Sequence, residues 1–190
     1  DTKTIRLYVD DERLNLDTAE LYDVKQVLDM RAGTLSRSFV WLTPLGKRVS
    51  VHSRRMVSFT HRHIATTKYT VTVDQAANIT LSSLIVNRQD MNRVTPSTPS
   101  ASSAKNGSQM ADPRKSDGFH ARVLNKEAGF DRGTRSVRAY RTSNSKMGVV
   151  VGAEHKLEVP GGVDWSREVQ SSDDRVRHLY QGQLGDGETV

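Results

Sequence analysis

The stretch that decides the fold class runs from residue 28 to residue 90, and it begins with LDMRAGTLSRSFVWL at residues 28–42. KRVSVHSRRMVSF follows at residues 47–59, and IATTKYTVTV at residues 64–73. β-Branched residues are enriched in these segments and alternate with polar residues, which is typical of strands with one buried face. Pro44 and Gly46 favour a hairpin between the first two segments. The stretch therefore predicts long antiparallel strands at 33–42, 47–59, 64–73 and 79–86.

The rest of the chain also predicts strands, with one short exception. Leu21, Val24 and Leu28 recur at spacings of three and four, which favours a helical turn within residues 18–27. Residues 92–117 are rich in serine, threonine and proline and are expected to form a flexible loop. Further strands are expected at 4–9, at 14–16 after a turn at 10–13, and at 119–125, 135–142, 146–159 and 175–183. The prediction is one all-β domain over residues 1–190, a large antiparallel β-sandwich of roughly ten strands with little helix.

Composition and charge narrow the classes of site and partner. The 190-residue chain has no cysteine, which excludes disulfides and thiolate metal sites and favours a cytoplasmic location. Its net charge of +6 comes from basic residues spread among acidic ones, which favours an ordinary solvated surface over a nucleic-acid site. No apolar run approaches the roughly 20 residues that span a bilayer, and no signal peptide is visible, so no membrane partner is expected. Both ends of the chain look like cuts inside a longer polypeptide.

No catalytic, cofactor-binding or metal-ligating residue is predicted, and no cofactor is expected. His61 and His63 have a spacing that puts two rings on one side of a strand, but no third ligand is evident, so a polar pair beside a turn is favoured over a zinc site. The acidic clusters at residues 10–12 and 173–174 are interpreted as solvated turns rather than as an acid–base pair acting on a glycoside. Serine spacing shows no nucleophile elbow, and no glycine-rich phosphate loop is present.

Three arginines and two tryptophans are the remaining candidates for ligand contact. Arg31, Arg37 and Arg55 lie in apolar strand contexts, and Arg55 is expected to share a face with Val49, Val51 and Val57. An arginine buried there needs a partner, so a structural pairing with a carboxylate such as Asp29 is favoured over a sugar or phosphate contact. Trp41 is expected in the core or an interface, and Trp165 is expected to be exposed.

The same stretch resembles the N-terminal domain of glycoside hydrolase family 65, which includes maltose, trehalose and kojibiose phosphorylases. The spacing of the strand elements matches as well, and the first 90 residues carry nearly all of the similarity. The residues that carry the resemblance are Leu28-Asp29-Met30-Arg31, Gly33, Leu35, Arg37, Gly46, Arg55, Ser58, Ala65, Tyr69, Thr72, Ile79 and Ser83.

The resemblance implies a β-sandwich of the galactose-mutarotase-like supersandwich type that precedes a helical linker and an (α/α)6 barrel. In that family the barrel carries the glutamate that acts as general acid, and phosphate or activated water attacks the anomeric carbon with inversion. None of these groups can be assigned to a residue of this chain. The resemblance therefore implies an accessory domain that is not catalytic alone, in a parent that acts on an α-linked disaccharide such as trehalose or maltose with phosphate and forms a homo-oligomer.

Two other classes of function stay open on the sequence alone. An independent carbohydrate-binding module would need exposed aromatic residues, and only 6% of the chain is aromatic. A nucleic-acid-binding β domain would need a basic stripe with interleaved aromatics, which is not visible. No nucleic-acid partner is therefore expected, and the accessory domain is the favoured interpretation.

Overall fold

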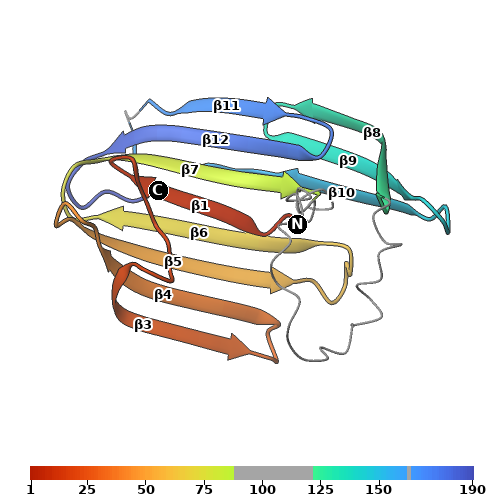
Figure 1. The fold of residues 1–190 in the computed structure, drawn as a ribbon. Helices are drawn as coiled ribbons and strands as arrows, with labels where there is room; N and C mark the ends of the chain where they lie inside the picture. Colours follow the sequence, from red (N-terminus) through yellow and green to blue (C-terminus); the bar gives the residue numbers. More distant parts are fainter. Residues whose placement is uncertain (88–121, 162–163) are drawn as a thin grey trace, which may run out of the picture. The chain divides into compact units, whose positions relative to one another are not determined.

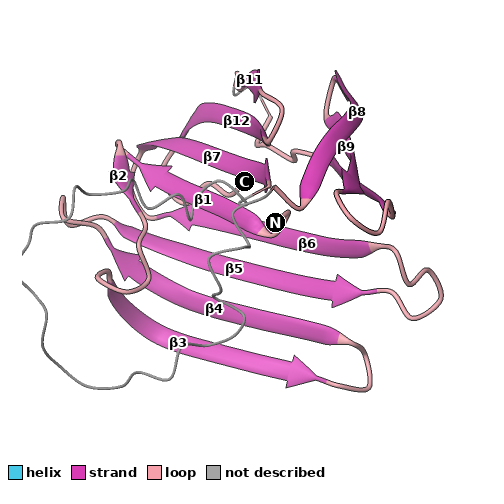
Figure 2. Ribbon diagram, turned by 45° about the vertical axis from the view of Figure 1, so that its right-hand side comes forward, coloured by secondary structure: helices cyan, strands magenta, loops and turns pink. Residues whose placement is uncertain are grey.

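A computed structural model describes residues 1–87, 122–161 and 164–190 of the chain. The described residues form strands and no helix (Figures 1 and 2), so none of them forms a helix that could cross a membrane. The expected loop at 92–117 lies outside the described residues. The strands are β1 (Thr4–Val9), β2 (Glu12–Arg13), β3 (Glu20–Asp29), β4 (Thr34–Leu42), β5 (Arg48–Val57), β6 (Ala65–Val73), β7 (Ala77–Val86), β8 (Leu124–Arg132), β9 (Arg135–Thr142), β10 (Gly148–Glu154), β11 (Ser166–Ser171) and β12 (Arg175–Leu184).

The chain divides into two compact units, and the larger one comprises residues 4–83, 156–170 and 177–190. Two sheets supply its core: a four-stranded sheet in the order β3-β4-β5-β6, and a five-stranded sheet in the order β11-β12-β7-β1-β2. Side chains from both sheets form one buried hydrophobic cluster, which makes this unit a β-sandwich. The cluster comprises Leu7, Val9, Phe39, Trp41, Val49, Val51, Val71, Val73, Ala77, Ile79, Leu81, Tyr180, Leu184 and Val190.

The hairpin of β4 and β5 shows how the sequence builds this core. Trp41 pairs with Val49 and Phe39 with Val51 across the two strands, so alternate residues of both strands enter the cluster. In the turn, the amide of Thr43 donates to the carbonyl of Lys47 over 2.9 Å, and Gly46 takes a φ of 82°. Glycine adopts that left-handed backbone without steric cost, which explains the expected hairpin at this position.

The smaller unit comprises residues 1–3, 84–155 and 171–176. Its described part is built on a three-stranded antiparallel sheet in the order β10-β9-β8. Arg138 on β9 is only 2% exposed, and its guanidinium bonds acceptors on β8 and β9. Its Nη2 donates to Asp131 Oδ2 over 2.8 Å, and its Nη1 donates to the carbonyl of Val137 over 2.8 Å. These acceptors offset the cost of removing the positive charge of Arg138 from water.

The all-β fold is confirmed, and the expected strands at 4–9 and 135–142 have the observed bounds. The helical turn expected at 18–27 is wrong, because those residues enter β3. A β-bulge between Tyr22 and Lys25 shifts the register there, and Asp23 takes a φ of 51°. The extra residue breaks the period of two and gives the apolar residues a spacing that imitates a helix.

Three other strand expectations also need correction. The return strand after the first turn is β2 at residues 12–13, not residues 14–16. Of the strand expected at 119–125, residues 119–121 lie outside the described residues, and β8 runs from 124 to 132. The strand expected at 146–159 is shorter and runs from Gly148 to Glu154. β11 was not expected, because Ser166–Ser171 contains one valine among polar and charged residues and so lacks an alternating pattern.

Candidate docking surface

The inner face of the four-stranded sheet, which packs against the five-stranded sheet, changes from buried to exposed along its strands. On β5, Val49 and Val51 are 0% and 2% exposed, Ser53 is half-buried, and Val57 is 59% exposed. Val57 lies on the same face as the buried valines because β5 keeps an unbroken register with β4 and β6. We call the uncovered half the distal inner face. It comprises Gln26, Leu28, Leu35, Arg37, Ser53, Arg55, Val57, Thr67 and Tyr69.

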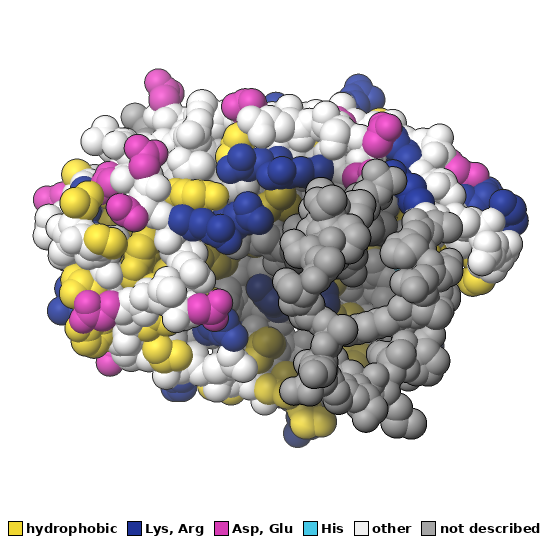
Figure 3. Space-filling view, viewed as in Figure 1, with side chains coloured by type: hydrophobic (Ala, Val, Ile, Leu, Met, Phe, Trp, Pro, Cys, Tyr) yellow, Lys and Arg dark blue, Asp and Glu magenta, His cyan; other side chains and the backbone are white. Residues whose placement is uncertain are grey.

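Large apolar side chains are exposed on the distal inner face and in the two turns beside it. Leu28 is 65% exposed and Val57 is 59% exposed. Met30, Phe59 and Ile64 in the adjoining turns are 81%, 72% and 43% exposed. Figure 3 shows hydrophobic side chains along the lower edge of the molecule, over the ends of β3 and β4. Contiguous exposed apolar side chains of this size are typical of protein interfaces.

Of the three arginines singled out from the sequence, Arg55 shares a face of β5 with Val49, Val51 and Val57, as expected. Arg31 and Arg55 are exposed, and Arg37 is half-buried. Arg37 donates to Gln26 Oε1 from Nε over 3.0 Å and from Nη2 over 2.7 Å. Among the described residues none of the three forms an ion pair, and Asp29 Oδ1 instead accepts from the amide of Ala32 over 2.9 Å. The expected pairing with Asp29 is therefore wrong.

Tyr69 lies in the same row of the distal inner face as Arg37, since Ser53 pairs with both. Burial raises the pKa of Tyr69 to about 12, although the positive charge of Arg55 opposes that rise. The hydroxyl is therefore protonated at neutral pH and can donate a hydrogen bond. The row thus combines a guanidinium, a serine hydroxyl and a phenol between apolar neighbours.

The two histidines considered as a pair lie close together without a metal-binding set. His61 and His63 are exposed in the turn between β5 and β6, with ring centroids 6.3 Å apart and ring planes at 67°. The amide of His61 donates to Ser58 Oγ over 2.9 Å, and its carbonyl accepts from the amide of Ile64 over 2.8 Å. They flank a turn, as expected, and are not on a strand. No group of three or more candidate ligands occurs among the residues that the structure describes.

The acidic cluster at residues 10–12 is a turn, but Asp10 is more enclosed than expected. Lys47 Nζ lies 2.6 Å from Asp10 Oδ2, and the amide of Asn78 donates to Oδ1 over 2.9 Å. Burial alone would raise the pKa of Asp10, but the contacts with Lys47 and Asn78 outweigh it and lower the pKa. Asp10 therefore ties the first turn to the β4–β5 hairpin and is not a solvated acid.

The acids at residues 173–174 are also tied to neighbours within the smaller unit. Lys126 Nζ lies 2.6 Å from Asp173 Oδ1, and Asn87 Nδ2 donates to Asp174 Oδ1 over 3.0 Å. Arg122 also pairs with Asp174. Asp174 is therefore a structural residue, whereas the Asp173 side chain is 78% exposed, as expected for a solvated turn.

One tryptophan lies in the core and the other packs at its edge. Trp41 is 3% exposed and belongs to the buried cluster. Trp165 was expected to be exposed, but it is half-buried and packs against that cluster. A Cβ placed on Gly182 would lie 2.5 Å from the Trp165 ring, so the indole rests directly on the glycine backbone. The sequence signal for this contact is Gly182 itself, which lies between Tyr180 and Leu184 on the face of β12 that enters the core.

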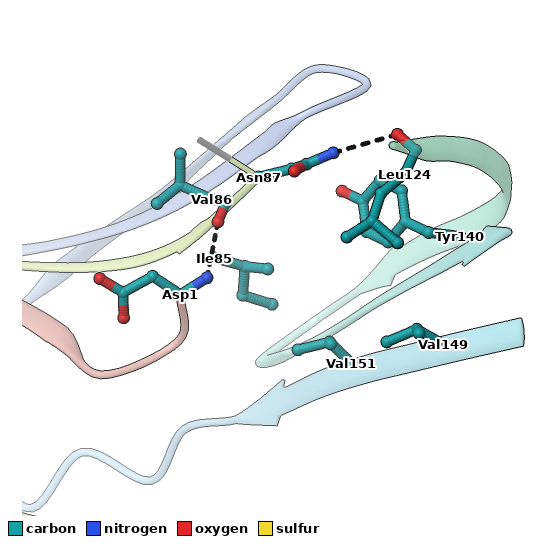
Figure 4. A pocket seen from close by; sticks show the side chains of 8 residues that line it. All are labelled: Asp1, Ile85, Val86, Asn87, Leu124, Tyr140, Val149 and Val151. Atoms are coloured by element: carbon teal, nitrogen blue, oxygen red, sulfur yellow. Dashed lines mark hydrogen bonds between the residues drawn. The ribbon is translucent and has the colours of Figure 1, made fainter. Parts of the chain in front are cut away.

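A pocket of about 430 Å³ lies in the smaller unit (Figure 4). Its lining is mainly aliphatic, and the polar groups in it are already bonded. The Asp1 ammonium donates to the carbonyl of Val86 over 2.7 Å, and the Tyr140 hydroxyl donates to the carbonyl of Asp173 over 3.2 Å. The lining residues are Asp1, Ile85, Val86, Asn87, Leu124, Tyr140, Val149 and Val151.

A second, smaller pocket of about 250 Å³ lies on the outer face of the four-stranded sheet, beside the bulge in β3. The lining residues are Asp23, Ser38, Phe39, Val40, Ser50, Val51, His52, Thr70 and Thr72. Thr72 Oγ1 is bonded to Thr189 Oγ1 over 2.8 Å. The lining thus combines four hydroxyl side chains, one carboxylate and one imidazole with the apolar residues Phe39, Val40 and Val51.

A comparison with known families identifies the chain. The sequence model described as the N-terminal domain of glycosyl hydrolase family 65 matches residues 1–190. The chain belongs to this family. The match covers the whole chain, so the similarity is not confined to the first 90 residues.

Relatives and a solved structure agree with this family assignment. An uncharacterized glycosyl hydrolase of Mycobacterium tuberculosis is 34% identical over 167 residues, which is 85% of this chain and 19% of that protein. The α,α-trehalose phosphorylase of Thermoanaerobacter brockii is 37% identical over 71 residues, which is 37% of this chain and 9% of that protein. The structure of a putative kojibiose phosphorylase from the human microbiome matches 98% of this chain and 20% of its own with a TM-score of 0.71 and 16% identity, which shows a common fold. The chain spans about a fifth of the length of the Mycobacterium relative.

Proposed function

We propose that this family 65 chain is the accessory N-terminal β domain of an inverting α-glucoside phosphorylase or hydrolase, and that it packs on a helical catalytic barrel. The observation that carries the proposal is the distal inner face. A sheet face that is buried at one end and presents exposed Leu28 and Val57 at the other leaves apolar surface that a second body would remove from water.

We base the proposed reaction of the parent protein on the names of its relatives. Trehalose phosphorylase and kojibiose phosphorylase are among the proteins that this chain resembles. We infer that the parent acts on an α-linked disaccharide with phosphate or water as acceptor, as a homo-oligomer in the cytoplasm. In this proposal the chain supplies no catalytic group. Its role is to support the barrel and shape the approach to it.

Turnover measured on two proteins tests this role. The 190-residue chain is expected to show no phosphorolysis or hydrolysis of trehalose, kojibiose or maltose, whereas the longer protein that contains it is expected to turn over one of them. Measurable turnover by a clean preparation of the short chain would contradict the proposal.

Light scattering tests the docking surface. The short chain is expected to self-associate as its concentration rises, because the distal inner face is uncovered. Val57→Lys should reduce that association, while Val40→Lys on the outer face of β4 is the matched control. A strictly monomeric chain at high concentration would argue against a docking surface here.

The pocket beside the β3 bulge favours one alternative, a carbohydrate-binding module. Hydroxyls with one carboxylate and one imidazole suit the hydrogen-bonding groups of a neutral sugar. Saturable binding of maltodextrin to the short chain, lost in Asp23→Asn and kept in Asp11→Asn, would support it. Asp11 is a matched control because it also takes a positive φ, of 70°, in an exposed turn.

A further inference from the structure

Two positive charges lie together on the distal inner face, and no described residue forms an ion pair with either of them. Arg37 on β4 is opposite Ser53, and Arg55 is two residues further along β5 on the same face. Such diagonal neighbours on adjacent strands have Cα atoms about 7–8 Å apart, which long side chains span easily. Arg37 bonds only the neutral amide of Gln26, and neither guanidinium pairs with a carboxylate among the residues that the structure describes.

Covering this face would be unfavourable unless the arginines gain an acceptor. Apolar neighbours surround them, with Leu35 directly opposite Arg55 and Leu28 opposite Leu35. A body that packs on those leucines also removes water from the guanidinium groups. An arginine left without an acceptor in such an interface costs several kcal/mol.

We propose that the segment docked on the distal inner face carries an aspartate or glutamate whose carboxylate accepts hydrogen bonds from both Arg37 and Arg55. This inference rests on the proposed docking role. It adds the chemistry of the partner: an apolar surface with an acidic side chain at its centre. Paired guanidinium groups suit a carboxylate because each presents planar N–H donors to both oxygens. Ser53 and Tyr69 in the adjoining row can donate further hydrogen bonds.

Other occupants fit these residues less well. A second copy of this chain in a two-fold interface would bring the same arginines toward one another, in a protein whose net charge is already +6, so self-association of the short chain through this face should be weaker than docking of an acidic partner. A free sugar or phosphate needs a cavity, and neither of the two pockets described above includes Arg37 or Arg55. The surface therefore favours a protein segment that brings its own carboxylate.

Hydrogen exchange in the longer protein tests the proposal, with peptides covering residues 26–37 and 53–69 as the readout. Arg55→Glu places two carboxylates together, and it should raise exchange in these peptides by at least about tenfold. Arg54→Glu is the matched control, because Arg54 is the next residue on β5 but lies on the outer face, and it should change exchange by less than about twofold. Arg55→Met should also raise exchange, since it leaves the partner's carboxylate with one arginine.

The outcomes separate this inference from the docking role itself. Val57→Lys disrupts the apolar contact without touching either arginine. If it raises exchange while Arg55→Glu does no more than Arg54→Glu, the docking role stands and the acidic partner is wrong. If Arg55→Met slows exchange, the partner is apolar at that point, and the inference is overturned. Inorganic phosphate that slows exchange in the wild type but not in Arg55→Met would assign the arginines to a free anion and would also overturn it.

Discussion

The buried ion pair of the smaller unit gives the sharpest stability prediction. Arg138 is 2% exposed and Asp131 keeps 25% of its side-chain surface exposed. Replacing Asp131 by asparagine removes the charge but keeps the shape. Breaking a buried pair costs about 3–5 kcal/mol, and the partial exposure of Asp131 reduces this to about 2–3 kcal/mol. The remaining acceptors of Arg138, such as the carbonyl of Val137, soften the loss but do not carry the charge.

Urea denaturation followed by circular dichroism measures this loss, with hydrogen exchange of the β8–β10 amides to place it in the smaller unit. Glu154→Gln is the matched control, because its pair with Arg135 joins β9 and β10 of the same sheet at 2.8 Å but both side chains are at least 60% exposed. That exposed pair should contribute no more than about 1 kcal/mol. Equal losses in the two variants, within about 0.5 kcal/mol, would refute the argument that burial determines the cost.

The same pair predicts a pH dependence of stability. Burial alone would raise the pKa of Asp131, but hydrogen bonds from Arg138, Ser136 and Ser171 and the charge of Arg138 hold it well below its usual range. The unfolded carboxyl has a pKa of about 3.9, so the unfolded state binds more protons in acid. The stabilisation is therefore complete above about pH 5 and is lost as the pH falls below about 4. Asp131→Asn should flatten this part of the unfolding profile.

Three further predictions concern the larger unit. Val71→Ala should lower the free energy of unfolding by about 2 kcal/mol, because Val71 is 0% exposed. Val57→Ala should change it by less than about 0.5 kcal/mol, because Val57 is 59% exposed. Equal effects of the two variants in urea titrations would contradict the change in burial along the inner face. Gly182→Ala should lower the free energy of unfolding by about 1–3 kcal/mol, because the added methyl group displaces Trp165. Gly148→Ala is the control, since a Cβ there meets no atom within 4 Å. An unchanged tryptophan emission spectrum in Gly182→Ala would disprove the contact. Tyr69, whose pKa is raised to about 12, should ionise at a higher pH than an ordinary tyrosine. Its contribution to stability is therefore complete below about pH 10 and is lost as the pH rises toward 12. Tyr69→Phe should remove this late step from an absorbance titration.

The sequence predicted the fold class because most strands alternate polar and apolar residues without interruption. β9 shows this well: Ser136, Arg138 and Tyr140 are buried in alternation, and its bounds were predicted correctly. The prediction failed where the alternation is broken, as in β3, whose bulge at Asp23 gave a helical spacing. It also failed at Trp165, because the contact that shelters this side chain comes from Gly182, a residue 17 positions away in the sequence.

The candidate surface shows a limit of a different kind. Val49, Val51, Ser53, Arg55 and Val57 alternate regularly along one strand, and nothing in that pattern tells where the second sheet stops covering them. Burial at each position depends on the length of the opposing sheet, which is a property of residues far away in the chain. An arginine in such a series was expected to need a carboxylate at once, because its burial was assumed. The structure shows instead that Arg55 is solvated while the face is uncovered, so its need for a carboxylate arises only when another body docks. That Arg55 forms no ion pair with a described residue is therefore a consequence of the same boundary that exposes Val57, and one docking event would cover both.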